Sequence, residues 1–178
     1  FDPAASERTI RIGMSDANEG WLVPQLLRDL AQAAPRMRFV IVPVQFRTVG
    51  HALASGAIDF AATVADELPA GTRRRSIFTG GFSCLYDPRH ARVGRTLTRA
   101  RYFAHQHVIV SYNGDLRGIV EDAHATPRRV RCSVASFAHV GALVDGSALV
   151  ATVPERIAAA IRETRPHLRT TALPFQIP

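Results

Sequence analysis

The most constraining feature of the sequence is the stretch Thr9–Ala34, which combines a strand, a polar turn and an amphipathic helix. Apolar and polar residues alternate from Thr9 to Met14, which is the two-residue period of a β-strand. Leucines and alanines then recur at helical spacing between Leu22 and Ala33. Because proline fits a helix best in its first turn, Pro24 places the expected helix start near Gly20 to Trp21. The stretch predicts an α/β fold that begins with a strand followed by a helix.

Three polar residues, Ser15, Asp16 and Asn18, lie between this strand and this helix. The N-terminus of a helix presents unpaired N–H groups and the positive end of its dipole, so it suits an anion or a carboxylate. The same residue types also cap helices, so each of the three has an ordinary structural role open to it. They become binding candidates if the rest of the chain builds a cleft beside them.

The composition is that of a globular protein, with 178 residues, 47% of them apolar and 21% charged. This is enough apolar material for a core, in one domain or two small ones. No apolar run is long enough for a transmembrane helix, and the first residues lack the pattern of a signal peptide, so we expect a cytoplasmic protein. Cys84 and Cys132 lie in apolar runs without metal-binding spacing and are expected to be inert core residues.

Charge and motifs argue against catalysis. The net charge is +7, and the sequence contains no lysine, so all 22 basic residues are arginine. Lysine chemistry is therefore excluded, and GxGxxG, GxSxG and HExxH are absent. The arginines at 73–75 and 128–131 flank expected strands and are interpreted as solvated strand ends, so we expect at most weak DNA binding.

The histidines give no catalytic or metal site. Ser136, His139 and Asp145 fall on one short expected helix, which is the wrong geometry for a catalytic triad. His105 and His107 are expected to form a surface pair on one strand face, with too few ligands for a metal. We therefore expect no enzyme activity, no metal and no cofactor.

The rest of the chain continues the alternation of strands and helices. We expect strands at 38–46, 58–64, 74–79, 82–86, 108–112, 130–134 and 149–153. We expect helices at 48–56, 116–123, 136–146 and 155–164. This alternation predicts two Rossmann-like α/β lobes, with a ligand cleft between them where the carboxyl ends of strands from both lobes meet.

The run His51–Ala62 resembles a signature of the effector-binding domain of LysR-type transcriptional regulators. In it, Gly56 is suited to a left-handed helix C-cap and Asp59 leads into a strand. Periplasmic solute-binding proteins share this motif, but further landmarks fall in register along the chain: Arg8-Thr9, Ser15-Asp16, Val23-Pro24, Asp87 with His90, His107–Ser111, Arg129-Val130, Leu149–Arg156 and Leu173–Phe175. The lead-in and first strand are most similar to the branch that contains sensors of aromatic compounds and nodulation signals.

The resemblance implies two lobes of the periplasmic-binding-protein type II architecture. It divides the chain into a linker from a missing DNA-binding domain (1–8), lobe I (9–78), lobe II (79–172) and the start of a return crossover (173–178). The His-Pro of the family is His90-Ala91 here, so the turn is expected to differ.

The resemblance also implies a homo-oligomer, which is a dimer or tetramer in the full-length protein. This oligomer is expected to contact DNA only through a helix-turn-helix domain outside this chain. Leu22, Leu26, Val140 and Val144 are the apolar positions expected in its interface.

The expected function is to bind a small-molecule inducer, first of all an aromatic acid or a phenolic, in the interlobe cleft. The candidate effector-binding residues are polar or aromatic positions near strand carboxyl ends: Ser15, Asp16, Asn18, Phe46, Arg47, Thr48 and Thr63 in lobe I, and Ser111, Tyr112, Ser136 and Phe137 in lobe II. We expect the effector carboxylate beside Ser15, with Ser136 or Ser111 approaching from the second lobe. A periplasmic-type solute-binding protein with the same architecture is the alternative.

Overall fold

The computed structural model describes residues 2–65, 68–94 and 96–177. The chain divides into two compact units, one up to Arg75 and one from Ser76 onward. Each unit has its own sheet and its own apolar clusters. Within the described residues, no helix is long and apolar enough to cross a membrane.

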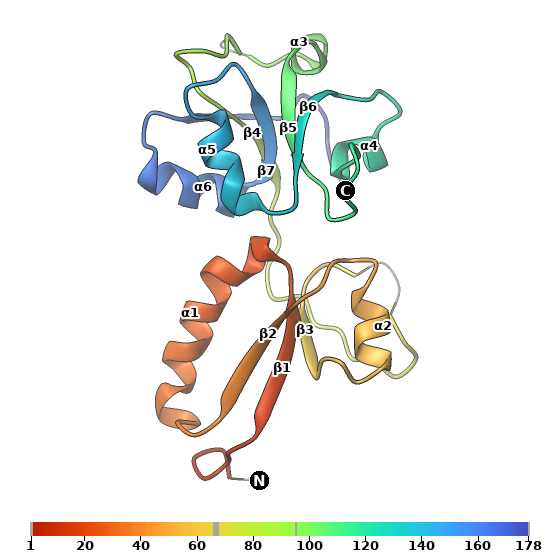
Figure 1. Ribbon diagram of the computed structural model, residues 1–178, viewed down its shortest axis with the longest axis vertical. Helices are drawn as coiled ribbons and strands as arrows, with labels where there is room; N and C mark the ends of the chain where they lie inside the picture. The colour runs from red at the N-terminus through yellow and green to blue at the C-terminus, as the bar shows by residue number, and fades with distance from the viewer. Residues whose placement is uncertain (1, 66–67, 95, 178) are drawn as a thin grey trace. The chain divides into compact units, whose positions relative to one another are not determined.

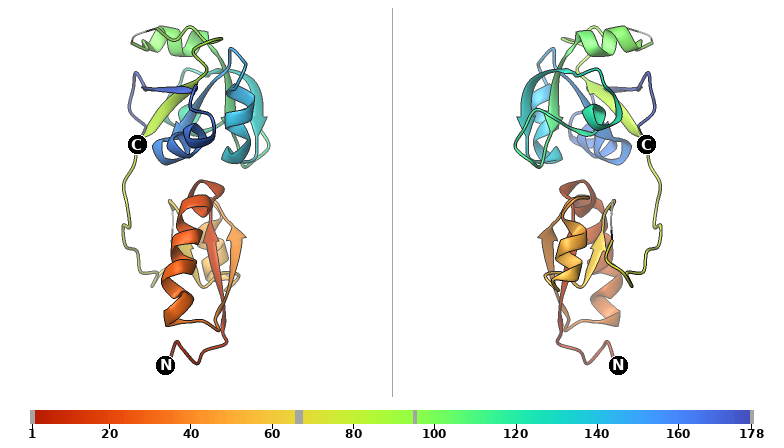
Figure 2. Two further views of the ribbon diagram at one scale, coloured as in Figure 1. Left: turned by 90° about the vertical axis from the view of Figure 1, so that its left-hand side faces the viewer. Right: turned by 90° about the vertical axis from the view of Figure 1, so that its right-hand side faces the viewer.

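The first unit is built on a three-stranded parallel sheet of order β2-β1-β3. The strands are β1 (Thr9–Met14), β2 (Arg38–Pro43) and β3 (Phe60–Ala62). The expected strand at 38–46 thus ends at Pro43, on an edge strand, where a missing N–H costs no ladder hydrogen bond. Helices α1 (Asp16–Ala33) and α2 (Val49–Ala54) lie on opposite faces of this sheet (Figure 1; Figure 2).

Helix α1 begins earlier than the sequence predicted. It starts at Asp16 rather than near Gly20, so Pro24 lies in its interior and not in its first turn. Proline lacks the N–H that would bond the carbonyl of Gly20, and the helix continues without that bond. Asp16 and Asn18 are therefore part of the first helical turn instead of the preceding loop.

The face of the sheet under α2 is closed by a small apolar cluster of Val44, Val49 and Ile58. Gly13 of β1 faces this cluster, and an added Cβ there would lie 2.6 Å from the Ile58 side chain. Gly56 has φ +70°, which confirms the predicted left-handed residue after α2.

The second unit contains a mixed five-stranded sheet of order β6-β5-β7-β4-β8. Its strands are β4 (Phe82–Tyr86), β5 (Gln106–Val110), β6 (Arg129–Val134), β7 (Val150–Pro154) and β8 (Arg169–Ala172). Strands β5, β6 and β7 are parallel, whereas β4 runs antiparallel to both β7 and β8. The first four match expected strands, and β8 is an edge strand that the sequence did not predict.

Helices cover both faces of this second sheet. They are α3 (Arg99–Ala104), α4 (Ile119–Ala123), the 3-10 turn η1 (Phe137–His139), α5 (Val140–Val144) and α6 (Glu155–Thr164). One core, under α5 and α6, includes Leu85, Val108 and Leu168, and the other, under α3 and α4, includes Cys84 and Tyr102. Burial raises the pKa of the Cys84 thiol to about 12, so this thiol stays protonated.

Several predictions about the second unit are wrong. Residues 74–79 form no strand, and the whole segment is exposed. His107 is completely buried rather than on the surface, since α3 packs over its end of β5. Val140 and Val144, which were candidates for an interface, are core residues with at most 1% exposure.

The segment after β8 packs on the second unit. Leu173, Phe175 and Ile177 contact the core under α3 and α4, and the Phe175 ring lies 5.0 Å from that of Tyr102. The division of the chain at 78/79 and the crossover at 173–178 remain predictions.

Candidate functional site

Three parallel strands of the first unit end at one edge. Met14 is in register with Pro43 on one side and with Ala62 on the other. The residues that follow these strands therefore emerge together, as expected for the carboxyl ends of a parallel sheet. Ser15 and Thr63, both half-buried, are the first of them.

Ser15 is the N-cap of α1, with an extended backbone. Its carbonyl accepts hydrogen bonds from the N–H groups of Asn18 and Glu19, but its hydroxyl makes no cap hydrogen bond. Asn18 donates from Nδ2 to the carbonyl of Ala62 at 2.9 Å, which ties α1 to the end of β3. The structure thus brings Ser15, Asp16, Asn18 and Thr63 together.

The other candidates of the first unit, Phe46, Arg47 and Thr48, do not follow their strand directly. They begin three residues after β2 ends at Pro43. The Arg47 guanidinium lies 5.2 Å from the centre of the Phe46 ring. Thr48 occupies the N-cap position of α2, but its hydroxyl accepts from the N–H of Gln45 instead of capping the helix. These three residues form the local turn between β2 and α2.

In the second unit, β5 and β6 end in register at Val110 and Val134. Ser111 continues the ladder by donating its N–H to the carbonyl of Val134. Its hydroxyl donates to Oδ1 of Asp115 at 2.5 Å, and Tyr112 beside it is 37% exposed. Asp115 is a residue that sequence reasoning missed, although its position in the Asn-Gly-Asp turn after the strand was the available signal.

Ser136 and Phe137 follow β6 at the same edge of this sheet. The Ser136 hydroxyl accepts from the N–H of Ala138 at 3.1 Å, which confirms the predicted cap. Phe137 is half-buried and packs against the core under α5 and α6. Ser111 and Ser136 thus belong to one strand edge, as Ser15 and Thr63 do in the first unit.

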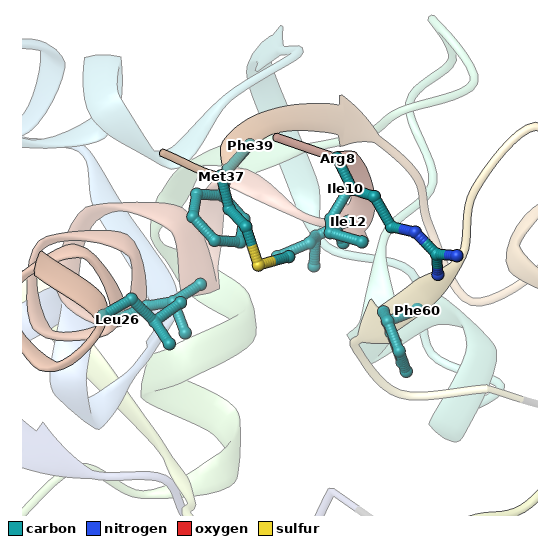
Figure 3. Close-up of a pocket in the computed structure, with 8 residues that line it drawn as sticks. Arg8, Ile10, Ile12, Leu26, Met37, Phe39 and Phe60 are labelled. Atoms are coloured by element: carbon teal, nitrogen blue, oxygen red, sulfur yellow. The ribbon is translucent and has the colours of Figure 1, made fainter. Parts of the chain in front are cut away.

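A separate hollow lies between α1 and the sheet of the first unit (Figure 3). It has a volume of about 490 Å³. Its lining is apolar except for one cation: Arg8, Ile10, Ile12, Leu26, Leu30, Met37, Phe39 and Phe60. None of the predicted site residues lines it.

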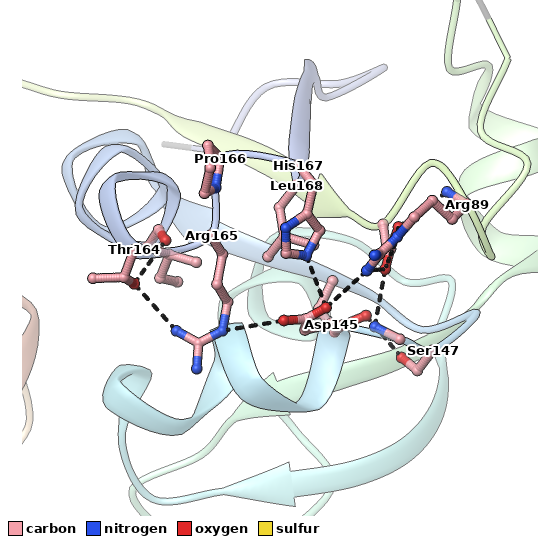
Figure 4. A network of polar contacts seen from close by, with 12 residues as sticks. Arg89, Asp145, Ser147, Thr164, Arg165, Pro166, His167 and Leu168 are labelled. Atoms are coloured by element: carbon pink, nitrogen blue, oxygen red, sulfur yellow. Dashed lines mark hydrogen bonds and ion pairs between the residues drawn. The ribbon is translucent and has the colours of Figure 1, made fainter.

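The second unit also contains a network of charged groups (Figure 4). Asp145 accepts from Arg89 at 2.9 Å and from His167 at 2.8 Å, and it lies 3.5 Å from Arg165. The hydrogen bond from His167 is the main reason that the pKa of Asp145 is lowered. The network connects the loop after β4, the end of α5 and the loop before β8.

Asp87 is the buried end of this network. Its carboxylate accepts from the side chain of Arg89 and from the N–H of Gly146. The Arg89 hydrogen bonds hold the pKa of Asp87 far below its usual range. Asp87, Asp145 and His167 each offer one metal-ligand atom within 4.8 Å of the others, but the Arg89 guanidinium already joins the two carboxylates. The arrangement is that of a structural ion-pair network.

A second ion pair lies inside the unit, beside the turn that contains Asp115. The Arg128 and Glu121 side chains are 2% and 7% exposed, and Nη2 and Oε2 are 2.5 Å apart. Glu121 also accepts from the N–H of Gly118. Burial is the largest influence on the pKa of Glu121 and raises it, but the hydrogen bonds and the charge of Arg128, together with the N–H of Gly118, outweigh burial, so the pKa is lowered. The interpretation of Arg128 as a solvated strand end was therefore wrong.

Comparisons with known proteins agree with this architecture. The chain matches the LysR substrate binding domain family over residues 3–178. The HTH-type transcriptional activator NahR of Pseudomonas putida is 33% identical over 89% of this chain and 54% of the relative. Nodulation protein D 1 of Mesorhizobium japonicum is 28% identical over 100% of this chain and 57% of the relative. The chain therefore spans about half the length of these curated relatives.

A solved structure gives the same result. The regulatory domain of MexT, a transcriptional activator in Pseudomonas aeruginosa, is 33% identical, with a TM-score of 0.82. The match covers 97% of this chain and 84% of that chain. The resemblance seen in the sequence and the predicted fold class are thus confirmed. The chain belongs to the LysR substrate-binding domain family, in which the fold is the two-lobe α/β architecture related to periplasmic binding proteins.

Proposed function

We propose that this chain is the effector-sensing part of a LysR-type transcriptional regulator and that it binds its inducer through the strand-end residues of each unit. The proposal depends mainly on the position and the uncommitted cap hydroxyl of Ser15. It stands at the N-terminus of an 18-residue helix, half-buried, and its hydroxyl is not used for capping. A hydroxyl and helix N–H groups in this position suit a carboxylate.

The proposed effector is an aromatic acid or a phenolic, with its carboxylate beside Ser15. Asn18 and Thr63 line the same strand edge, and Arg47 supplies a guanidinium from the neighbouring turn. Asp16 in the first turn of α1 repels an anion that approaches its carboxylate directly, so the effector carboxylate is proposed to meet the Ser15 side of the turn. The proposed set is completed by Phe46, Thr48, Ser111, Tyr112, Ser136 and Phe137.

The activity of the whole protein is also a proposal. Two of the relatives are named transcriptional activators, so we assign this chain a role in transcription regulation and no catalytic activity. DNA contact is proposed through a helix-turn-helix domain, in the part of the relatives that this chain does not span. We further propose a homo-oligomer that works in the cytoplasm. The solute-binding alternative is less well supported, because these relatives are regulators.

The test is calorimetric titration of benzoate and its hydroxylated derivatives into the chain and its Ser15→Ala variant. Loss of one charge-assisted hydrogen bond lowers affinity about 10-fold or more. Ser55→Ala is the matched control, because Ser55 is an exposed serine at the end of α2 in the same unit. Equal affinity of wild type and Ser15→Ala for every compound that binds would show that Ser15 is only a helix cap.

A further inference from the structure

The hydrogen bond between Ser111 and Asp115 determines which groups at the strand edge of the second unit can donate or accept a further hydrogen bond. Ser111 is 5% exposed, and its Oγ donates its single proton to Oδ1 of Asp115 at 2.5 Å. A hydroxyl has one proton, so Ser111 in this arrangement has none left to donate to an effector carboxylate. It also accepts from the N–H of Asn113.

Asp115 keeps acceptor capacity. It is half-buried, and besides the Ser111 hydroxyl it accepts from the N–H of Arg117 at 3.0 Å. Both bonds end on Oδ1. Because a carboxylate has about four acceptor sites, these two bonds leave room for a further donor.

The charged groups around Asp115 also favour a hydrogen-bond donor, and not an anion, as its partner. The guanidinium of Arg117 lies 3.7 Å from Asp122 and donates to the carbonyl of Glu121, so it turns toward α4. Arg128 is paired with Glu121. Among the described contacts no guanidinium hydrogen-bonds the Asp115 carboxylate. The hydroxyl of Ser111 and then the N–H and the charge of Arg117 lower the pKa of Asp115, so it is ionised at neutral pH. An effector carboxylate placed here would be repelled, whereas a hydroxyl would be bound.

We propose that the effector presents a hydrogen-bond donor, a phenolic or alcoholic hydroxyl, to the carboxylate of Asp115, and that Ser111 is the positioning residue for this carboxylate. The inference rests on the proposed function, since it concerns the strand edge assigned to the effector. It narrows the effector class from aromatic acids in general to hydroxylated ones. It also assigns Ser111 a different role from the one that the sequence suggested.

The test is a comparison of benzoate with 2-, 3- and 4-hydroxybenzoate by calorimetric titration. At least one hydroxybenzoate is expected to bind wild type about 10-fold more tightly than benzoate, which is the value of one hydrogen bond to a charged group. Asp115→Asn is expected to abolish this preference, so that no hydroxybenzoate binds the variant about 10-fold more tightly than benzoate does. Ser111→Ala is expected to reduce the preference. Asp122→Asn, which removes an exposed carboxylate from α4, is the control, and this variant should keep the preference for a hydroxybenzoate over benzoate.

The outcomes separate the two proposals. If all four compounds bind wild type alike and Ser15→Ala weakens each, the effector site stands and the role of Asp115 is refuted. A hydroxyl preference that persists in Asp115→Asn also refutes it, because the hydroxyl is then recognised elsewhere. If none of the compounds binds, both the aromatic effector and the role of Asp115 are refuted. Thermal unfolding of each variant shows whether a loss of binding comes from a loss of folding.

Discussion

The two units differ in how completely their helices cover their sheets. In the second unit, α5 and α6 close one face and α3 and α4 the other, and side chains such as Leu85 and Val108 are fully buried. In the first unit, α1 contains no buried residue, although it is the longest helix of the described chain. The sheet face beneath it borders the hollow of about 490 Å³, and Phe60 of β3 is 62% exposed.

The difference also extends to charged groups. The second unit buries Asp87 and Arg128 and pairs both, whereas every residue buried in the described part of the first unit is apolar. Burying charges is favourable only when partners are supplied, so the second unit depends on exact pairing as well as on apolar area. The first unit depends on a small apolar cluster and on the sheet itself. Substitutions should therefore have different costs in the two units.

The largest effect is expected from Arg128→Met. This change leaves the Glu121 carboxylate buried without its partner, so the free energy of unfolding of the second unit should fall by about 3–5 kcal/mol. Urea unfolding measures this loss, with Arg131→Met as the control, because Arg131 is an exposed arginine on β6, the strand that begins just after Arg128. A double variant with methionine at both Glu121 and Arg128 should recover much of the loss. A loss under about 1 kcal/mol would mean that the pair is solvated after all.

Core substitutions test the packing difference directly. Leu85→Ala removes a fully buried side chain and should cost about 2–5 kcal/mol, because it leaves a cavity. Leu26→Ala at the open hollow should cost less than about 2 kcal/mol, since solvent already reaches this side chain. Denaturant unfolding of the two variants gives the comparison. Equal costs would show that α1 is packed as tightly as the second unit.

The buried His107 predicts a pH dependence confined to the second unit. Burial lowers its pKa to about 4, whereas a histidine in an unfolded chain titrates near 6.5. Between these values the unfolded state binds a proton that the folded state does not. Stability is therefore full above about pH 6.5 and should fall by up to about 3 kcal/mol as the pH approaches 4.

Unfolding midpoints measured from pH 7.5 to 4.5 test this dependence. His107→Gln should flatten the profile, and His90→Gln, which changes an exposed histidine of the same unit, should not. His105, whose pKa is also lowered by partial burial, contributes to the slope that remains. An unchanged slope in His107→Gln would assign the pH dependence to other groups.

The smallest effects concern the two serine caps. Ser136→Ala removes a hydrogen bond to the N–H of Ala138 and should cost about 1 kcal/mol of stability. Ser15→Ala removes no cap hydrogen bond and should cost less than about 0.5 kcal/mol. Thermal unfolding distinguishes them. A larger loss for Ser15→Ala would show that its hydroxyl has a structural role and would weaken its assignment to the effector.

Local patterns in the sequence determined most of the elements and the family. The alternation at Thr9–Met14, the left-handed Gly56 and the cap at Ser136 each depend on residues close together in the chain, and each was predicted. The motif around Gly56 and Asp59, together with the landmarks in register along the chain, also indicated the family. Such features are accessible to sequence reasoning because periodicity and capping are local.

The tertiary structure alone decided burial, pairing and the start of α1. Arg128 lies in a run of arginines that suggested solvent, and only the packing of α4 beside β6 buries it against Glu121. The sequence suggested that His107 forms a surface pair with His105, whereas in the structure α3 covers His107. The proton of Ser111 is committed to Asp115 by the shape of one turn. Burial and hydrogen-bond direction depend on which segments meet in space, and the sequence carries no local signal for that.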